Sequence, residues 1–213
     1  MLGILFDLDG TLLDTLADLT DGVNYALSRH GLPQRTMDEV RAFVGDGAAR
    51  LIHRATGGTE NWEAVLADFR VYYDAHCRVK TGLYPGIRET VNRLAERFPV
   101  AVVSNKPDSA VKLLCADYFP GVLAMGESPA CPRKPDPAML RLAMERLGVD
   151  RCVYVGDSEV DVLTARNAGV PCVSVLWGFR DLDVLEQAGA KYLCHNPWDL
   201  ERVILSIGEH NGQ

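Results

Sequence analysis

Short runs of almost wholly apolar residues recur along the chain, and their lengths suit β-strands. They occupy residues 2–8, 100–104, 122–125, 152–155 and 172–175. Helical patterns lie between them at residues 108–116, 137–147 and 160–168, and a further strand and helix follow at 191–194 and 198–207. Such apolar runs are typical of strands covered on both faces. The alternation predicts an α/β fold with a Rossmann-like parallel sheet and helices on both sides.

Residues 15–83 interrupt this alternation. Their apolar residues recur at helical intervals, at positions 16, 19, 23, 26 and 27, then 40, 43 and 44, then 48, 51, 52 and 55, and finally 62, 65, 66, 69 and 73. Thr15 followed by Asp18 predicts a capping box at the start of the first helix. We therefore predict a Rossmann-like core formed by residues 1–14 and 84–213, with an all-helical cap at 15–83 lying over the end of the first strand.

The charge balance and the cysteines limit the partners that this chain is expected to have. Lys and Arg number 22 against 29 Asp and Glu, a formal net charge of −7, which argues against nucleic acid as a partner. A small anionic substrate is still compatible, because a few local cations can hold it. No apolar run approaches the roughly 20 residues of a membrane span. The six cysteines form no Cys-x-x-Cys pair, so we expect free thiols, no membrane partner and a cytoplasmic protein.

Polar residues gather where the predicted strands end. In an open α/β sheet, ligands bind beyond the carboxyl ends of the strands. Four carboxylates, one hydroxyl, one amide and one lysine follow the strands at these ends: Asp7 and Asp9, Ser104 and Asn105, Lys134, and Asp157 and Asp161. Asp7 and Asp9 point the same way because they are two residues apart in extended chain. We expect all of these side chains to share one rim of the sheet.

So many carboxylates on one rim require a cation. Two like charges about 4 Å apart cost roughly 4 kcal/mol at an effective dielectric near 20. Several such pairs would rival the whole stability of a domain, about 5–15 kcal/mol. Ligands that are all oxygen atoms favour a hard divalent ion, and a site completed by water and a substrate phosphate favours Mg²⁺ over Ca²⁺. The sequence therefore predicts Mg²⁺ as the cofactor.

Each candidate residue also has a purely structural interpretation. Asp157 and Asp161 suit the start of the helix that follows them. Ser104 and Asn105 suit a simple strand exit, and a lone lysine such as Lys134 is commonly solvated. Asp7 is different, because a charge at the end of a buried strand needs a partner or a purpose. The order in which the four groups occur favours a functional site.

Four segments resemble the motifs of the haloacid dehalogenase-like (HAD) phosphohydrolases, in the family's order and across the whole chain. They are Phe6-Asp-Leu-Asp-Gly-Thr-Leu-Leu-Asp14, Val102-Val-Ser-Asn-Lys-Pro107, Lys134-Pro-Asp-Pro137 and Gly156-Asp-Ser-Glu-Val-Asp161. The helical insertion resembles the C1-type cap of that family. The phosphoglycolate phosphatase branch is the most similar in three segments: Asp14-Thr15, the cap stretch from Phe43 to Leu51, and Tyr84-Pro-Gly86.

The resemblance implies a phosphatase with a covalent intermediate. Asp7 would be the nucleophile and form an aspartyl-phosphate, and Asp9 would act as the general acid and base. Lys134 would hold the Asp7 carboxylate and the phosphate. A dehalogenase is disfavoured, because expelling a halide needs no acid two residues after the nucleophile.

The resemblance also implies the binding residues. The expected metal ligands are the Asp7 carboxylate, the Asp157 carboxylate and the main-chain carbonyl of Asp9. Asp161 is expected to orient a metal-bound water or Lys134 without binding the metal directly. The expected substrate-binding residues are Thr11, Ser104, Asn105 and Lys134, with Arg50 of the cap as a candidate for a substrate carboxylate. Arg50 also suits a surface position near a helix start.

Several functional alternatives stay open at this point. The expected substrate is a small phosphorylated metabolite such as 2-phosphoglycolate, and pyrophosphate, nucleotides and sugar phosphates are alternatives within the superfamily. A phosphomutase similar to β-phosphoglucomutase would use the same aspartyl-phosphate. A non-catalytic metal and phosphate sensor would have lost Asp7 or Asp9, and both are present. Both a monomer and a homodimer agree with the sequence.

Overall fold

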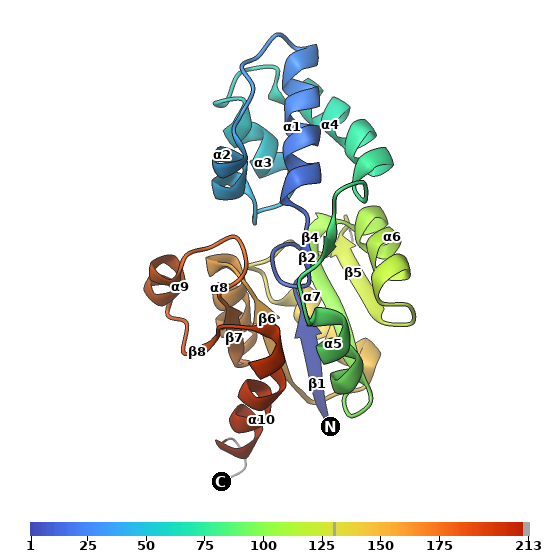
Figure 1. Cartoon of the computed structure of the whole chain (residues 1–213), viewed down its shortest axis with the longest axis vertical. Coiled ribbons are helices and arrows are strands. Elements are labelled where there is room, and N and C mark those ends of the chain that lie inside the picture. Colours follow the sequence, from blue (N-terminus) through green and yellow to red (C-terminus); the bar gives the residue numbers. More distant parts are fainter. Residues whose placement is uncertain (130, 211–213) are drawn as a thin grey trace.

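The computed structural model describes residues 1–129 and 131–210, so residues 130 and 211–213 of the predicted core segment lie outside the described residues. The described strands form a six-stranded parallel sheet in the order β5-β4-β1-β6-β7-β8 (Figure 1). They are β1 (Leu2–Phe6), β4 (Val100–Pro107), β5 (Leu123–Glu127), β6 (Arg151–Gly156), β7 (Cys172–Val175) and β8 (Tyr192–Cys194). The predicted α/β fold with a Rossmann-like parallel sheet is confirmed.

Helices cover both faces of this sheet. Ile4 and Phe6 of β1 belong to one apolar cluster and Leu5 to another, as expected for side chains that alternate between faces. The first cluster is completed by α5 (Ile87–Ala95), α6 (Asp108–Tyr118) and α10 (Leu200–His210), and the second by α7 (Ala138–Leu147) and α8 (Glu159–Ala168). Burial on both faces explains why the strand sequences are almost wholly apolar.

Two further helical elements complete the core. The helix α9 (Leu182–Ala188) packs against α8, and a short 3₁₀ helix, η1 (Pro197–Asp199), precedes α10. Neither α5 nor α9 is predicted from the sequence, although Ile87, Val91 and Leu94 of α5 recur at helical intervals and are buried. Among the described helices, none is both long enough and apolar enough to cross a membrane.

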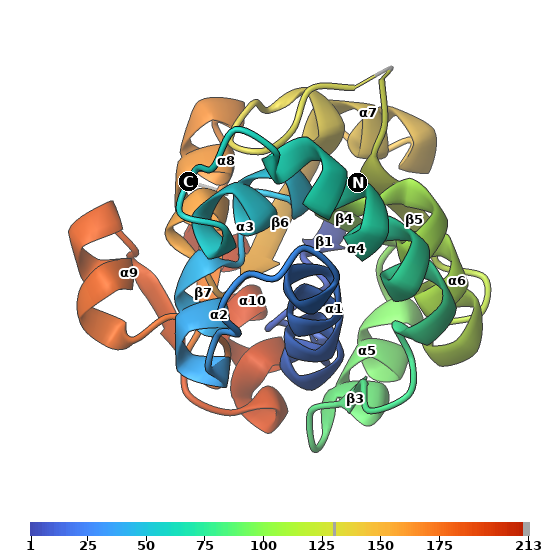
Figure 2. The same ribbon diagram turned by 90° about the horizontal axis from the view of Figure 1, so that it is seen from above.

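The segment between β1 and α5 is largely helical. It contains α1 (Leu16–Arg29), α2 (Met37–Phe43), α3 (Ala48–Ala55) and α4 (Trp62–His76). These helices, which we call the cap, bury an apolar cluster of their own around Val23, Ile52 and Phe69. Both views place the cap over the carboxyl ends of the strands (Figures 1 and 2). The cap therefore covers the rim where the candidate site residues lie.

The cap joins the core through a pair of short strands that the sequence patterns do not predict. β2 (Leu13–Asp14) pairs antiparallel with β3 (Gly82–Leu83). The chain therefore enters and leaves the cap at the same place.

The predicted capping box at the start of α1 is wrong. The Thr15 side chain makes no cap hydrogen bond, and its buried hydroxyl accepts or donates none in the structure. Asp18 instead accepts hydrogen bonds from the backbone N–H groups of Lys80, at 2.9 and 3.0 Å, and Thr81, at 2.9 Å. Asp18 is buried, so this contact ties the first helix of the cap to the segment that leaves it.

We predict that Asp18→Ala lowers the free energy of unfolding by about 1.5–3 kcal/mol, because two backbone N–H groups lose a charged acceptor. Asp21→Ala is the matched control, since Asp21 forms an exposed ion pair with Lys80 that solvent screens. Urea unfolding of both variants measures the difference. Equal losses in the two variants would contradict the role given to Asp18.

Candidate active site

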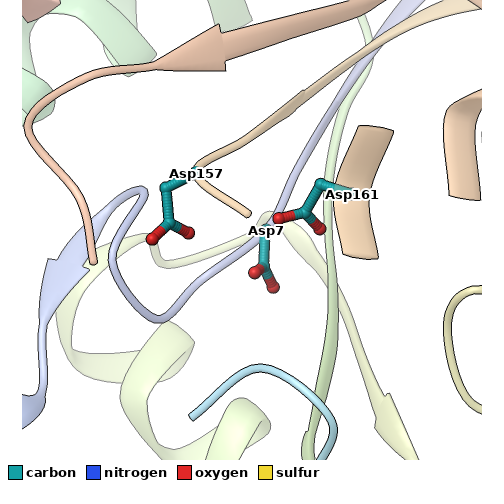
Figure 3. Close-up of side chains that lie close together, drawn as sticks. All are labelled: Asp7, Asp157 and Asp161. Carbon is teal, nitrogen blue, oxygen red and sulfur yellow. The ribbon is translucent and has the colours of Figure 1, made fainter. Parts of the chain in front are cut away.

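Three of the predicted carboxylates lie together below the cap. Asp7 follows β1, Asp157 follows β6, and Asp161 belongs to the first turn of α8. One oxygen atom of each lies within 4.8 Å of the others, and all three residues are buried (Figure 3). The carboxyl ends of neighbouring parallel strands β1 and β6 bring the three together, as the sequence predicts.

The loops around Asp157 hold its carboxylate in place. The Thr11 hydroxyl donates to Oδ1 at 3.1 Å, and the Phe179 backbone N–H donates to Oδ2 at 2.7 Å. Gly10 has a φ of +80°, and a Cβ atom there would lie 2.2 Å from Asp157 Oδ2. Only glycine fits this turn. The prediction that Thr11 binds substrate is corrected, because Thr11 is fully buried, contacts Asp157 and does not line the cavity.

Lys134 lies between two of the carboxylates. Its Nζ atom is 2.9 Å from Asp7 Oδ1, 2.8 Å from Asp161 Oδ1 and 2.8 Å from the Tyr154 hydroxyl. Asn105 fixes the lysine backbone by accepting from its N–H at 2.8 Å and donating to its carbonyl at 3.0 Å. Sequence reasoning misses Tyr154, which donates to Asp161 at 2.9 Å. The one available signal is a tyrosine inside an otherwise aliphatic strand.

The three carboxylates differ in how well they are compensated. Burial alone would raise the pKa of Asp161, but Lys134 and hydrogen bonds from Ser158 and Tyr154 outweigh it, and the pKa lies below its ordinary value. Burial raises the pKa of Asp7 and of Asp157 well above the ordinary range. Asp7 Oδ1 accepts no hydrogen bond and has only the ion pair with Lys134. Asp7 and Asp157 are therefore the carboxylates that lack compensating charge.

A divalent ion fits this deficit. Asp7, Asp9, Asp157 and Asp161 face two buried ammonium groups, those of Lys134 and Lys106, which leaves two negative charges unbalanced. Oxygen donors in this number suit a hard divalent cation.

The site opens into a small cavity between cap and core. The cavity has a volume of about 50 Å³. Its polar lining is Asp7, Asp9, Ser104, Asn105, Lys106, Asp157, Ser158 and Arg180, while the cap contributes mainly apolar side chains such as Leu51, Phe69 and Tyr73. The Ser104 oxygen accepts from the Lys106 backbone N–H at 3.3 Å, which leaves its hydroxyl proton for a ligand.

The prediction for Arg50 is corrected by the structure. Arg50 lies on α3 with an exposed side chain and does not line the cavity. The helix turns this position away from the face that packs over the core, where Ala48 and Leu51 lie instead. The cationic residues in the cavity lining are Lys106 and Arg180, and sequence reasoning assigns a role to neither.

Core side chains grip the cap loop formed by residues 44–47. Asn105 donates to the Gly45 carbonyl at 3.1 Å, and Arg133 donates to the Asp46 carbonyl at 3.2 Å. Arg180 donates to the carbonyls of Val44 and of Arg41. These contacts hold the cap closed over the carboxylates.

Known proteins are similar to this chain in sequence and in fold. The family profile of the haloacid dehalogenase-like hydrolases matches residues 1–169. Phosphoglycolate phosphatase of Xanthomonas campestris pv. campestris is 38% identical over 83% of this chain and 84% of that protein. Phosphoglycolate phosphatase 1 of Pseudomonas aeruginosa is 36% identical over 83% of this chain and 70% of that protein. A crystal structure from Lactobacillus delbrueckii subsp. bulgaricus, of a protein proposed to be a phosphoglycolate phosphatase, has a TM-score of 0.90 at 37% identity, covering 95% of this chain and 97% of that one.

The parallel sheet, the carboxylates at its rim and these matches define a hydrolase with a Rossmann-like α/β fold. The chain belongs to the haloacid dehalogenase-like hydrolases. Its relatives within that family are phosphatases, which makes this chain a phosphatase as well. The resemblance of the four sequence motifs to the haloacid dehalogenase-like phosphohydrolases is therefore confirmed.

We predict that, without a divalent ion, the free energy of unfolding falls as the pH rises from about 5.5 to about 8. The reason is that Asp7 and Asp157 keep their protons to a higher pH in the folded protein than in the unfolded chain. The folded state then binds more protons, and ionising these groups costs stability. Adding MgCl₂ should stabilise the protein more at the higher pH, because ligand carboxylates must be ionised.

Urea unfolding at both pH values, with and without MgCl₂, measures these effects. Asp157→Asn should reduce both the pH dependence and the stabilisation by MgCl₂. The matched control is Asp150→Asn. Asp150 is an exposed carboxylate just before the amino end of β6, far from the site, where it pairs with the N-terminal amino group. A stabilisation by MgCl₂ that is the same at both pH values would contradict this account of the site.

Proposed function

We propose that this phosphatase is a Mg²⁺-dependent phosphomonoesterase that forms an aspartyl-phosphate at Asp7, with 2-phosphoglycolate as its preferred substrate. The observation that carries the proposal is the placing of Asp7 and Asp9 in one cavity, beside an acidic cluster that lacks two positive charges. The names of the relatives support the substrate. The small cavity also favours a compact substrate over a large one.

In the proposed first step, an Asp7 oxygen attacks phosphorus and the bond from phosphorus to the ester oxygen breaks. Asp9 gives a proton to the departing oxygen. In the second step, Asp9 takes a proton from a water molecule, whose oxygen attacks the phosphorus of the aspartyl-phosphate. Inorganic phosphate leaves and the Asp7 carboxylate is restored. The closed cap limits access of bulk water to the cavity.

The residues around Asp7 supply the charge and alignment on which phosphoryl transfer depends. Lys134, whose Nζ atom lies 2.9 Å from Asp7 Oδ1, opposes the rise that burial causes in the pKa of Asp7 and would help to neutralise the phosphoryl group. Ser104 and Asn105, which line the cavity, would bind the phosphate. Mg²⁺ would be held by Asp7, Asp157 and the main-chain carbonyl of Asp9, with Asp161 keeping Lys134 in position. When bound, the metal neutralises negative charge on the phosphoryl group.

Two alternatives within the superfamily use the same core residues. A phosphomutase would return the phosphoryl group to a sugar phosphate, and a pyrophosphatase or nucleotidase would release a different leaving group. Apart from Tyr73, the cap residues that line the cavity are apolar or glycine, so they give a sugar few hydrogen-bond partners, which favours hydrolysis of a small ester.

We predict that Asp7→Asn abolishes turnover, because an amide is a poor nucleophile, and that Asp9→Asn lowers kcat about 10²- to 10⁴-fold. Hydroxylamine, which cleaves acyl phosphates, should trap an intermediate in the wild type and none in Asp7→Asn. Asp150→Asn should retain full activity. Turnover by Asp7→Asn above a trace would refute the nucleophile.

We predict that 2-phosphoglycolate gives the highest kcat/KM in a panel that also contains pyrophosphate, AMP and β-glucose 1-phosphate. The assay measures released phosphate with MgCl₂ and after chelation with EDTA, which should stop turnover. Formation of glucose 6-phosphate in the presence of a sugar bisphosphate would favour the mutase instead. A higher kcat/KM for another member of the panel would replace the proposed substrate.

A further inference from the structure

A second buried lysine lies in the cavity, and the proposed chemistry does not use it. Lys106 is at the end of β4, and its side chain is 2% exposed. Its Nζ atom lies 2.8 Å from Asp9 Oδ1 and 3.1 Å from Asp9 Oδ2. A buried ammonium group is tolerated only while an anion faces it. In this structure Asp9 is that anion.

The other cation in the cavity lining, Arg180, already donates a hydrogen bond from each of its three side-chain nitrogen atoms. Arg180 donates through Nε to Glu159 at 2.8 Å, through Nη1 to the Arg41 carbonyl at 2.9 Å and through Nη2 to the Val44 carbonyl. These bonds hold the cap loop, so using Arg180 to bind a ligand would loosen the closed cap. Of the two cations, Lys106 is the one whose partner can exchange without breaking a contact between cap and core.

A tyrosine of the cap completes the environment of Lys106. The ring centroid of Tyr73, on α4, lies 4.7 Å from Lys106 Nζ. Its hydroxyl is buried in the cavity wall and has no hydrogen-bond partner. Burial raises the pKa of Tyr73, so the phenol keeps its proton and stays a donor. An unpaired buried donor costs stability unless a ligand supplies an acceptor.

We propose that Lys106 and Tyr73 are specificity-determining residues that bind a carboxylate on the substrate, a few bonds from the phosphate ester, and that Asp9 pairs with Lys106 when no substrate is bound. This inference rests on the proposed function, because it takes the ester oxygen to lie beside Asp9. The substrate class is a small phosphate ester of a hydroxy acid.

Replacement of Asp9 by a substrate carboxylate at Lys106 would let the site select esters that carry a carboxylate. When a substrate carboxylate takes over the ammonium group, Lys106 stays neutralised and the Tyr73 hydroxyl gains an acceptor. Asp9 is then released from the ammonium group, takes up a proton from solvent and faces the ester oxygen as the acid of the first step. An ester without a carboxylate leaves Asp9 bound to Lys106 and the Tyr73 donor unpaired. A site with buried polar groups of this kind rejects an analogue that cannot pair with them by about 10²-fold or more.

The test compares 2-phosphoglycolate with ethyl phosphate, which has the same ester and chain length but no carboxylate. We expect the wild type to prefer 2-phosphoglycolate in kcat/KM by about 10²-fold or more. Lys106→Met should bring this ratio close to one, and Tyr73→Phe should reduce it about tenfold. Lys112→Met, which removes an exposed lysine of α6, is the matched control and should leave the ratio unchanged.

The outcomes separate this inference from the function on which it rests. If the wild type hydrolyses both esters with similar kcat/KM, phosphomonoester hydrolysis is supported and recognition of a carboxylate by Lys106 and Tyr73 is contradicted. This outcome needs no variant. If Lys106→Met lowers kcat/KM by the same factor for both esters, Lys106 only positions Asp9, and the inference again falls. If the wild type hydrolyses neither ester, the proposed function fails, and the inference fails with it.

Discussion

The structure depends on balancing negative charge that is buried under the cap. Four carboxylates come from the ends of β1 and β6 and from α8, and two ammonium groups, from β4 and the loop after β5, oppose them. Removed from water, such charges interact more strongly than on a surface, so each needs a defined partner. Lys134 and Lys106 compensate two of the carboxylates, and the remaining two define a place for a divalent cation. The excess of carboxylates over ammonium groups thus favours a bound cation.

The parts of the site that follow from strand geometry could be predicted from the sequence. Asp7, Asp157 and Asp161 meet because parallel strands present their carboxyl ends at one edge. The same reasoning assigns no role to Lys106 or Tyr154, because the sequence does not show which groups a lysine at a strand end or a tyrosine within a strand will contact. Their partners are set by tertiary packing.

The predictions that failed were based on local patterns. A capping box describes four neighbouring residues, whereas Asp18 accepts from N–H groups more than sixty residues away in sequence. Arg50 was a candidate for a substrate carboxylate because it lies in the cap, but its position on α3 leaves it exposed to solvent. Thr11 lies four residues after Asp7, yet its hydroxyl donates to Asp157. The contacts of Asp18, Arg50 and Thr11 depend on which side chains lie close together in the folded protein. A single sequence does not contain these distances.

The paired strands β2 and β3 have a mechanical consequence. Leu13 is paired with Leu83 and Asp14 with Gly82, so the two chain segments that connect the cap to the core run side by side. Leu13 also accepts a hydrogen bond from the N–H of Gly10, in the tight turn against Asp157. A rotation of the cap about this pair of strands would therefore shift the turn that confines the Asp157 carboxylate. The position of the cap and the position of Asp157, a proposed metal ligand, would then be coupled through this turn.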